Sequence, residues 1–446
     1  MKDKIDPICN GVFYFGNMEN IEKIYSFLVN GGKAVIDSRL VEEGDVFFAL
    51  KGETVDGNLF AKEALAKGAA IAVIDNPSQA AEGAILVPDS LKCLQRVAHY
   101  HRKQLGIPVL AITGSNGKTT TKELLSAVLS KKFFVTFTKG NLNNHIGVPL
   151  TILSFDRNSE FGVVEMGANH KREIGELAEI AEPDYGIITN IGKAHLEGFG
   201  SVEGIMEGKG ELYDFLSRHG GLAFYNADST LLSKMVSTRT KMRTLPYSKE
   251  VLGATVVDSP AESPYLCVEI EDIGLVNTHL FGDYNVENIL AAASVGRYFG
   301  IANRMIKEAI EGFVPSNNRS QIAKTAHNIV LLDCYNANPS SMRSALAGVV
   351  QVDHPSKVAI LGDMLELGNF SLAEHKEMVE LALQCGFQKI LLVGPMFTKA
   401  SEGISLLSFN SYKELEKHLE EMPVINSFVL VKGSRGIQLE RIFDKL

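Results

Sequence analysis

The residues best suited to chemistry lie in the segment VLAITGSNGKTTTKE, residues 109–123. An apolar strand is expected to end at Thr113, and Lys118, Thr119 and Thr120 open a helix. Small and polar residues form the loop between them: Gly114, Ser115, Asn116 and Gly117. Such a loop turns backbone N–H groups toward phosphates, while a lysine balances their charge and a hydroxyl reaches Mg²⁺. The segment therefore predicts a cradle for ATP, although Ile112 stands where the standard P-loop has its first glycine.

Two isolated ionisable residues follow other expected strands. Glu165 ends the strand in FGVVEM, and His195 comes a few residues after the strand in YGIITNI. Ligands of open parallel sheets bind at the carboxyl ends of strands, so both side chains are expected beside the phosphate loop. Both fit a Mg²⁺ site. A structural hydrogen bond explains Glu165 equally well, and an ordinary loop histidine explains His195 better, because Mg²⁺ prefers oxygen ligands.

An asparagine-rich segment, TKGNLNNHIGVPL, covers residues 138–150. Three amide side chains precede an expected short apolar strand: Asn141, Asn143 and Asn144. Amides donate and accept hydrogen bonds, which suits the recognition of a polar substrate. A turn that favours asparagine for its left-handed conformation accounts for the pattern equally well.

The order of the expected elements predicts an α/β fold with three domains. Residues 1–106 mix short β-rich pieces with helical ones, as in a small α/β domain. Residues 107–318 alternate buried strands, glycine-containing turns and amphipathic helices, which implies a parallel sheet covered on both faces. The same alternation restarts in residues 319–446 as a Rossmann-like unit. Residues 251–279, rich in Val, Thr and Ser, are expected to form strands at the edge of the central domain.

Composition excludes some functions. The 446 residues carry 44 Lys+Arg against 53 Asp+Glu, a formal charge of -9 that gives no electrostatic footprint for nucleic acid. Five scattered cysteines suggest neither a zinc site nor a disulfide framework: Cys9, Cys93, Cys267, Cys334 and Cys385. The first 23 residues lack the apolar core of a signal peptide, and no stretch is long and uncharged enough to span a bilayer. A cytoplasmic protein that is neither exported nor membrane-embedded is expected.

Several segments occur together in one order: GSNGKTT, GNLNNHIGVPLT, EMGANH and NIGKAHLEGFGS. In this combination the chain resembles the Mur ligase family, ATP-dependent amide-bond synthetases of peptidoglycan assembly. The resemblance extends to DSRLVEEGDVFFALKGETVDG, GDYNVENILAA, NNRS, DCYNANPSSM, ILGDMLELG and VKGSRG. It implies a UDP-sugar peptide-binding domain, a central P-loop ATPase domain and a closing C-terminal domain. YNANP with LGDMLELG is similar to the member that adds D-alanyl-D-alanine to UDP-N-acetylmuramoyl-tripeptide. We expect this chain to be a monomer.

The resemblance also implies roles at the reacting phosphate. Gly114 to Thr120 would hold the triphosphate, with Lys118 on its terminal phosphates. Thr119 and Glu165 would hold a first Mg²⁺, and His195 with a carbamylated Lys209 would hold a second. Without the resemblance, Lys209 would be interpreted as a solvated helix lysine, and Lys193 is a weaker alternative for the modified residue.

Further roles follow from matching motifs. The nucleotide would be contacted by Asn288, supported by Asn285, and by Arg319 and Asp333 on closure, although the asparagines also suit helix caps. The uridine diphosphate pocket is similar at Ser38, Arg39, Lys51, Gly52, Asp56 and Gly57, whereas Asn58 replaces the usual histidine. The dipeptide would lie near Asn336, Asn338 and Arg435. Asn338 before Pro339 is equally a natural helix cap.

Other functions stay open. The chain could be a sibling ligase that adds a single amino acid, a homologue that only binds its UDP-sugar ligand, or a P-loop kinase. An intact set of both expected metal sites argues against mere binding, and a kinase has no use for two outer domains. The identity of the third stem-peptide residue, meso-diaminopimelate or lysine, is not encoded in a recognisable pattern.

Overall fold

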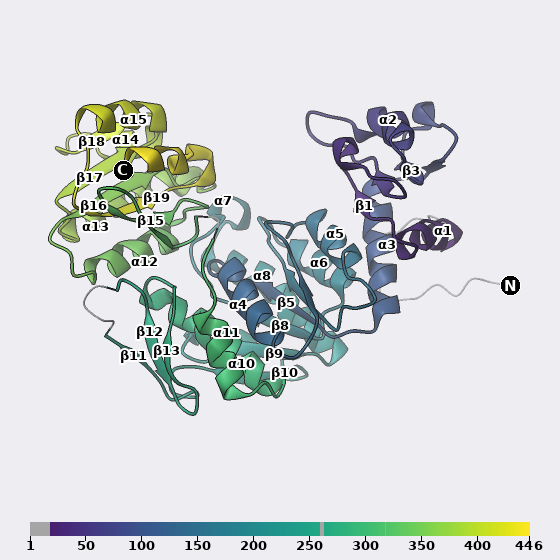
Figure 1. Ribbon diagram of the computed structural model, residues 1–446, viewed down its shortest axis with the longest axis horizontal. Helices are drawn as coiled ribbons and strands as arrows, with labels where there is room; N and C mark the ends of the chain where they lie inside the picture. Colours follow the sequence, from purple (N-terminus) through teal and green to yellow (C-terminus); the bar gives the residue numbers. More distant parts are fainter. Residues whose placement is uncertain (1–17, 259–262, 317) are drawn as a thin grey trace. The chain divides into compact units, whose positions relative to one another are not determined.

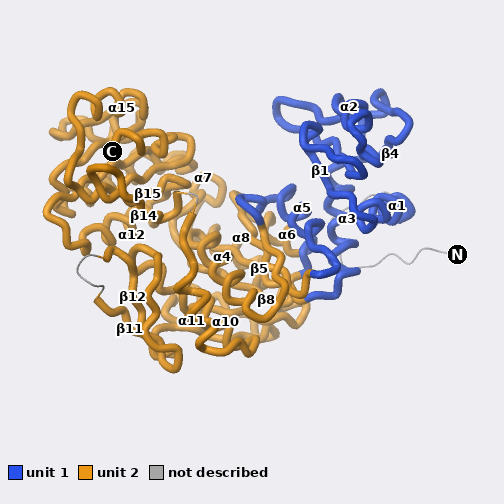
Figure 2. The backbone as a smooth tube through the Cα atoms, viewed as in Figure 1, with its two compact units in different colours: residues 1–107, 139–158, 179–182 blue, residues 108–138, 159–178, 183–446 orange. Residues whose placement is uncertain are grey.

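A computed structural model describes residues 18–258, 263–316 and 318–446, so Cys9, Asn317 and most of the N-terminal segment discussed above lie outside the described residues. The chain forms two compact units (Figure 2). The first comprises residues 1–107, 139–158 and 179–182, and the second comprises residues 108–138, 159–178 and 183–446. The expected boundaries of three domains remain a prediction.

The first unit is built on a four-stranded parallel sheet in the order β1-β2-β3-β4. Its strands are β1 (Ala34–Val35), β2 (Val46–Phe48), β3 (Ile71–Ile74) and β4 (Ala84–Leu86). Its helices are α1 (Met18–Val29), α2 (Ala61–Ala66), α3 (Ser90–Leu105) and α5 (Gly147–Leu153). Successive strand side chains face opposite sides, so Val46 and Phe48 pack with α1 and α3, whereas Phe47 packs with α2. Both faces of the sheet are therefore buried.

Helix α5 corrects one expectation, because IGVPL was predicted as the start of a short strand. The Asn144 side-chain oxygen accepts hydrogen bonds from the backbone N–H groups of Ile146 and Gly147, at 3.1 and 2.9 Å. Pro149 is the third residue of the helix, where a backbone N–H has no partner within the helix, so its ring is tolerated. The local capping chemistry thus decides for a helix.

The second unit contains a six-stranded parallel sheet in the order β10-β9-β8-β5-β7-β6 (Figure 1). Its strands are β5 (Val109–Thr113), β6 (Val135–Phe137), β7 (Phe161–Glu165), β8 (Tyr185–Ile188), β9 (Leu222–Asn226) and β10 (Arg243–Tyr247). Its helices are α4 (Lys118–Leu129), α6 (Glu173–Ala181), α7 (Leu196–Phe199), α8 (Val202–His219), α9 (Thr230–Ser237), α10 (Val286–Tyr298) and α11 (Asn303–Glu311). After β5 the chain forms β6 and β7 on one side of β5, and it then crosses to form β8 on the other side. Such a reversal of strand order creates the binding crevice of open α/β sheets.

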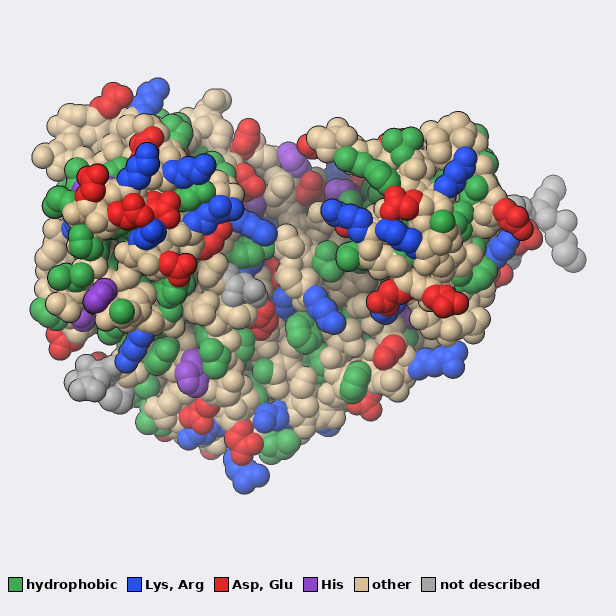
Figure 3. Space-filling model, turned by 45° about the horizontal axis from the view of Figure 1, so that its top comes forward, with side chains coloured by type: hydrophobic (Ala, Val, Ile, Leu, Met, Phe, Trp, Pro, Cys, Tyr) green, Lys and Arg blue, Asp and Glu red, His purple; other side chains and the backbone are tan. Residues whose placement is uncertain are grey.

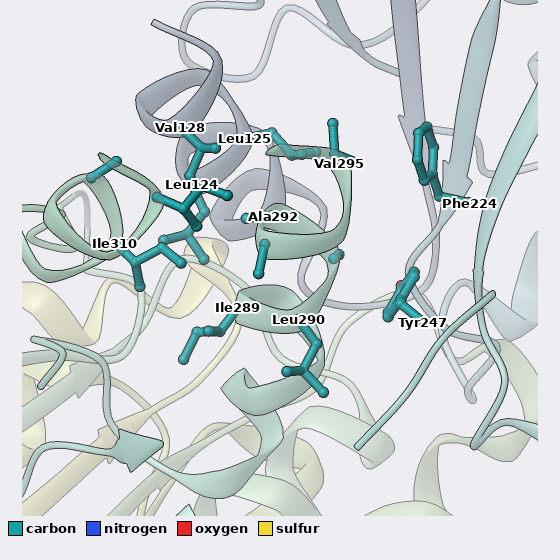
Figure 4. Close-up of a cluster of buried hydrophobic side chains, with 14 of the residues drawn as sticks. Leu124, Leu125, Val128, Phe224, Tyr247, Ile289, Leu290, Ala292, Val295 and Ile310 are labelled. Carbon is teal, nitrogen blue, oxygen red and sulfur yellow. The ribbon is translucent and has the colours of Figure 1, made fainter. Parts of the chain in front are cut away.

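The core beneath β5 fixes the start of α4. Leu124, Leu125 and Val128 of α4 pack against Ile289, Ala292 and Val295 of α10 and against Ile310 of α11 (Figure 4). Each of these side chains is fully buried, which stabilises the fold by about 1.5–3 kcal/mol for a large aliphatic residue.

The segment 251–279 forms strands, as expected. They make a separate antiparallel sheet of β11 (Ala254–Val257), β12 (Cys267–Ile270) and β13 (Gly274–Asn277).

A second six-stranded sheet, in the order β14-β15-β19-β16-β17-β18, occupies the C-terminal part of the chain. Its strands are β14 (Gln321–Lys324), β15 (Ile329–Asp333), β16 (Lys357–Gly362), β17 (Lys389–Val393), β18 (Leu407–Phe409) and β19 (Phe428–Lys432). Its helices are α12 (Pro339–Val350), α13 (Ser371–Gln384), α14 (Pro395–Ala400) and α15 (Tyr412–Glu421). Only β14 is antiparallel to its neighbour. The prediction of an α/β fold with a second Rossmann-like sheet is confirmed.

The surface carries charges of both signs. On the face drawn in Figure 3, Lys and Arg side chains lie interspersed with Asp and Glu side chains. Among the described residues, no helix combines the length and the apolar character needed to cross a membrane. The four described cysteines, Cys93, Cys267, Cys334 and Cys385, form no disulfide bonds with one another.

Candidate active site

The loop between β5 and α4 is held by residues that follow β8. The Asn116 N–H donates to the Asn190 side-chain oxygen at 2.9 Å, and the Ser115 N–H donates to the Asn190 carbonyl at 3.0 Å. The Thr189 hydroxyl donates to the Asn116 carbonyl at 2.6 Å. Gly117, with φ 77°, is the N-cap residue of α4, and as a glycine it has no side chain to cap the first N–H groups of the helix. A helix start of this kind attracts anions.

Gly114 has the least room for a side chain. Its φ is 148°, and a Cβ placed there would lie 1.9 Å from the Thr189 hydroxyl oxygen. We expect Gly114→Ala to lower the free energy of unfolding by about 1–3 kcal/mol through overpacking, measured by urea denaturation. Gly106→Ala is the matched control, because Gly106 has φ 62° but open space around its Cβ. Equal losses in the two variants would contradict a steric role for Gly114.

Lys118 and Thr119 lie at the first turn of α4. The Lys118 ammonium donates to the carbonyl oxygens of Gly114 and Ser115, at 2.8 and 3.3 Å. Burial lowers the pKa of Lys118, and the Glu165 carboxylate opposes that shift. Lys118 thus holds the loop together and places a positive charge beside it. Thr120, the next residue, is half-buried.

The Glu165 carboxylate is buried next to Thr119. The Thr119 hydroxyl donates to Glu165 Oε2 at 2.9 Å, and the Glu165 N–H donates to the Thr138 hydroxyl at 2.9 Å. Lys122, with 1% of its side chain exposed, places its ammonium 3.6 Å from the same Oε2. Sequence reasoning missed Lys122. Its position four residues after Lys118, on the same helix face, was the available signal.

Lys209 is fully buried in α8, so the interpretation of a solvated lysine is wrong. Its ammonium nitrogen lies 5.5 Å from the centre of the Phe199 ring, and no described group forms a hydrogen bond with it. Desolvation, followed by the positive charge of Lys118, lowers the pKa of Lys209 well below its ordinary value. A neutral, nucleophilic amine is therefore favoured at this position.

Lys193, the weaker alternative, is engaged elsewhere. Its ammonium lies 2.7 Å from Glu374 Oε1, and its N–H donates to the Ser340 hydroxyl at 2.9 Å. The side chain is 45% exposed, in contrast to that of Lys209.

His195 is the N-cap residue that precedes α7, and its backbone is left-handed, with φ 53°. Its Nδ1 lies 2.6 Å from Oε2 of Glu366, which belongs to the segment after β16. The contact with His195 lowers the pKa of Glu366, and partial burial opposes this effect. Sequence reasoning quoted the LGDMLELG segment but assigned no role to Glu366.

Asn288 packs against the phosphate loop. Its side-chain oxygen accepts a hydrogen bond from the Thr121 hydroxyl at 2.9 Å, and its amide donates to the Asn285 side-chain oxygen at 2.8 Å. A Cβ on Gly117 would lie 2.7 Å from the Asn288 oxygen. Asn285 occupies the N-cap position of α10 as the alternative expected, but its side chain makes no capping hydrogen bond, whereas Asn288 lies inside the helix.

Residues from the C-terminal sheet form a second polar group. The Arg319 guanidinium lies 3.4 Å from the centre of the Tyr335 ring, and that of Arg435 lies 5.7 Å from the same ring. The Asp333 carboxylate lies 2.6 Å from the buried Lys432 ammonium and accepts a hydrogen bond from the Ser320 N–H at 3.1 Å.

Asn338 has two partners. Its side chain caps α12 by accepting from the Ser341 N–H at 2.9 Å, and its amide donates to the Asn116 side-chain oxygen at 2.8 Å. The residue is therefore a helix cap and also contacts the phosphate loop. The Asn336 side chain accepts a hydrogen bond only from the neighbouring Ala337 N–H among the described contacts that involve that side chain.

The expected uridine diphosphate residues and the three asparagines of residues 141–144 belong to the first compact unit. Ser38 and Arg39 lie in the short helix η1 (Ser38–Leu40), where Arg39 holds the pKa of Asp37 at about 2. Lys51 lies 3.0 Å from Asp75. Asn58 is buried and donates to the carboxylates of Asp56 and Asp75, at 2.7 and 2.9 Å. Asn58, which departs from the expected histidine, thus orders this loop.

Comparison with known proteins covers most of the chain. Family models match as the Mur ligase family catalytic domain over residues 34–111, the Mur ligase middle domain over 112–296 and the Mur ligase glutamate ligase domain over 318–435. A Bacillus subtilis protein described as UDP-N-acetylmuramoyl-tripeptide--D-alanyl-D-alanine ligase is 34% identical over 92% of both chains. An Escherichia coli protein of the same description is 33% identical over 92% of both chains.

Solved structures of MurF enzymes are also similar to this chain over most of its length. A MurF structure from Acinetobacter baumannii has a TM-score of 0.83 at 29% identity and covers 94% of this chain and 97% of its own. The MurF ligase from Thermotoga maritima in complex with ADP gives the same values. With relatives above 30% identity along almost its whole length and a phosphate loop in the matching domain, the chain belongs to the Mur ligase family.

Proposed function

We propose that this chain joins D-alanyl-D-alanine to UDP-N-acetylmuramoyl-tripeptide at the expense of ATP, in peptidoglycan synthesis. The products are the UDP-linked pentapeptide, ADP and orthophosphate. The observation that carries the proposal is the near full-length likeness to relatives described as this ligase, together with an ordered phosphate loop. The family match also supports the use of ATP, since a solved relative was crystallised with ADP.

The reaction has two steps. A carboxylate oxygen of the tripeptide attacks the γ-phosphorus of ATP, and ADP leaves, which gives an acyl phosphate. The amine of the dipeptide then attacks the acyl carbon, loses a proton and expels orthophosphate. Both steps depend chiefly on orientation and charge stabilisation. The start of α4 and the Lys118 ammonium would supply fixed positive potential for the phosphates, while the Ser115 and Asn116 N–H groups order the loop by donating to Asn190.

The donor set fits a first Mg²⁺. The Thr119 hydroxyl and the Glu165 carboxylate are hard oxygen ligands that already lie 2.9 Å apart. When bound, Mg²⁺ neutralises charge on the phosphate oxygens. The Lys122 ammonium, 3.6 Å from Glu165 Oε2, places a positive charge beside this carboxylate.

The surroundings of Lys209 fit carbamylation by CO₂. An ammonium repels a metal ion, whereas a carbamate offers two anionic oxygens, and its formation requires a neutral amine. Burial and an unpartnered nitrogen provide that amine. With His195, the modified Lys209 would hold a second Mg²⁺.

The remaining residues would bind the substrates. Asn288, Arg319 and Asp333 would contact the nucleotide, and Asn336, Asn338 and Arg435 would lie near the dipeptide. The uridine diphosphate would be bound by Ser38, Arg39, Lys51 and Asp56, and the peptide by Asn141, Asn143 and Asn144.

Closure of the C-terminal elements would exclude water, which hydrolyses acyl phosphates. The contact of Asn338 with Asn116 supports such closure. We place the reaction in the cytoplasm and assign it to a monomer.

The test is orthophosphate release by the purified protein with Mg²⁺-ATP and UDP-N-acetylmuramoyl-tripeptide. We expect release only when D-alanyl-D-alanine is added, with a product heavier by one dipeptide less water. Release with a single amino acid would assign the chain to a sibling activity. No release with any amine would favour mere binding, and phosphate transfer to a hydroxyl would favour a kinase. Tripeptides ending in meso-diaminopimelate and in lysine, compared by kcat/KM, identify the preferred third residue.

A further inference from the structure

The segment LGDMLELG, after β16, is fixed from several directions. The Asp363 carboxylate accepts hydrogen bonds from the N–H groups of Met396 and Phe397 at the start of α14, at 2.9 and 2.8 Å. The Met364 N–H donates to His375 Nε2 at 3.0 Å, and the Leu365 N–H donates to the Ser434 hydroxyl at 2.9 Å. The backbone that leads into Glu366 is therefore anchored to α13, to α14 and to the segment after β19.

Glu366 itself has a strained backbone. Its φ is 63°, in the left-handed region, which costs a side chain with a Cβ about 1 kcal/mol or more. Glycine is the residue that adopts this conformation freely. A glutamate kept there, on an anchored segment, points to a use for its carboxylate.

The carboxylate reaches a residue of the central sheet. Glu366 Oε2 lies 2.6 Å from Nδ1 of His195, and the Glu197 N–H donates to the Glu366 carbonyl at 3.4 Å. A Cβ on Gly368 would lie 3.2 Å from Cγ of Glu197, so the two segments approach closely at this point. His195 also has a positive φ, 53°. Both members of the pair thus sit in unusual backbone conformations that bring their side chains together.

We propose that Glu366 is a positioning residue for His195: its carboxylate keeps the imidazole proton on Nδ1 and so leaves Nε2 as the metal-binding nitrogen. Metal-binding histidines commonly donate their other N–H to a carboxylate, which fixes the tautomer and the ring orientation. This inference rests on the proposed function, in which His195 holds the second Mg²⁺. Because Glu366 follows β16 and His195 follows β8, the ligand is oriented only while the C-terminal elements contact the central sheet.

Mn²⁺ is the probe, because free Mn²⁺ is counted by electron paramagnetic resonance without any turnover. The full chain is titrated with Mn²⁺ in the presence of bicarbonate, a non-hydrolysable ATP analogue and UDP-N-acetylmuramoyl-tripeptide. We expect the wild-type protein to bind two ions and Glu366→Ala to bind the second about tenfold more weakly. Glu366→Gly should behave the same way while unfolding at the wild-type temperature or above, since it removes both the carboxylate and the strain.

Glu374→Gln is the matched control. It removes a carboxylate that contacts Lys193 between the same two groups of elements, but it does not touch His195. Unchanged binding of both ions in Glu366→Ala, or an equal weakening in Glu374→Gln, would overturn the inference. His195→Ala separates the two proposals. If it loses the second ion while Glu366→Ala does not, only the role of Glu366 fails; if it keeps both ions, the metal role of His195 fails and the inference fails with it.

Discussion

Lys209→Ala should lower kcat by a factor on the order of 10³, the scale of losing one strong electrostatic contribution to a transition state. The side chain is fully buried and its nitrogen has no hydrogen-bonding partner in the described part of the chain. A structural lysine would not be kept in this state, because burial of an unpaired charge is costly. The measurement is orthophosphate release under saturating substrates.

The same variant tests carbamylation. Short-chain carboxylic acids such as propionate fit the space left by the lysine and return a carboxylate to it, so they should restore part of the activity of Lys209→Ala. Full activity of the variant, or a complete lack of rescue, would contradict the hypothesis. Lys193→Ala is the control, because that lysine is paired with Glu374 and 45% exposed, and no acid should affect it.

Replacement of Lys209 should lower activity but raise the free energy of unfolding. Lys209→Met keeps most of the side-chain volume and removes a buried polar group without a partner, which should raise the free energy of unfolding by about 1–3 kcal/mol. Loss of turnover together with a gain in stability is typical of a residue retained for function. A large destabilisation would instead indicate that the ammonium supports the fold.

Local patterns were enough to predict part of this site. The phosphate loop could be predicted because β5, the glycine loop and α4 are consecutive, and the chemistry of phosphate binding restricts the residue types. The carboxyl-end positions of Glu165 and His195 followed from the general geometry of parallel sheets. By contrast, IGVPL was predicted as a strand, since the capping role of Asn144 is a matter of three-dimensional geometry.

Other features depend on contacts between distant segments. Lys209 is buried with its ammonium 5.5 Å from the centre of the Phe199 ring, and a Cβ on Gly208 would lie 2.4 Å from the same ring. The glycines at 208 and 210 were a signal for close packing around α8, against Phe199 and against Met235 respectively, but they did not identify these partners. Lys122 and Glu366 were missed for the same reason, because their significance lies in the residues they contact, Glu165 and His195.

Lys118→Met is the second substitution with a large expected effect, a fall in kcat on the order of 10³. The Lys118 ammonium lies at the first turn of α4 and donates to two loop carbonyls, so it can turn to the phosphates without displacing the backbone. Negative charge builds up on the leaving oxygen of ADP as the phosphoryl group is transferred. Loss of the Lys118 ammonium should therefore destabilise the transition state more than it weakens binding of the nucleotide.

Separate measurements of nucleotide affinity and turnover distinguish these effects. We expect the Kd of ADP to rise only about tenfold in Lys118→Met, while kcat falls much further. Lys131→Met, at a partly exposed position 3.9 Å from Glu308, should change neither. If Kd rose as much as kcat/KM fell and kcat were unchanged, Lys118 would contribute only to ground-state binding. The phosphate loop would then retain ATP, and the acceleration of acyl phosphate formation would have to come from the groups around Glu165, His195 and Lys209.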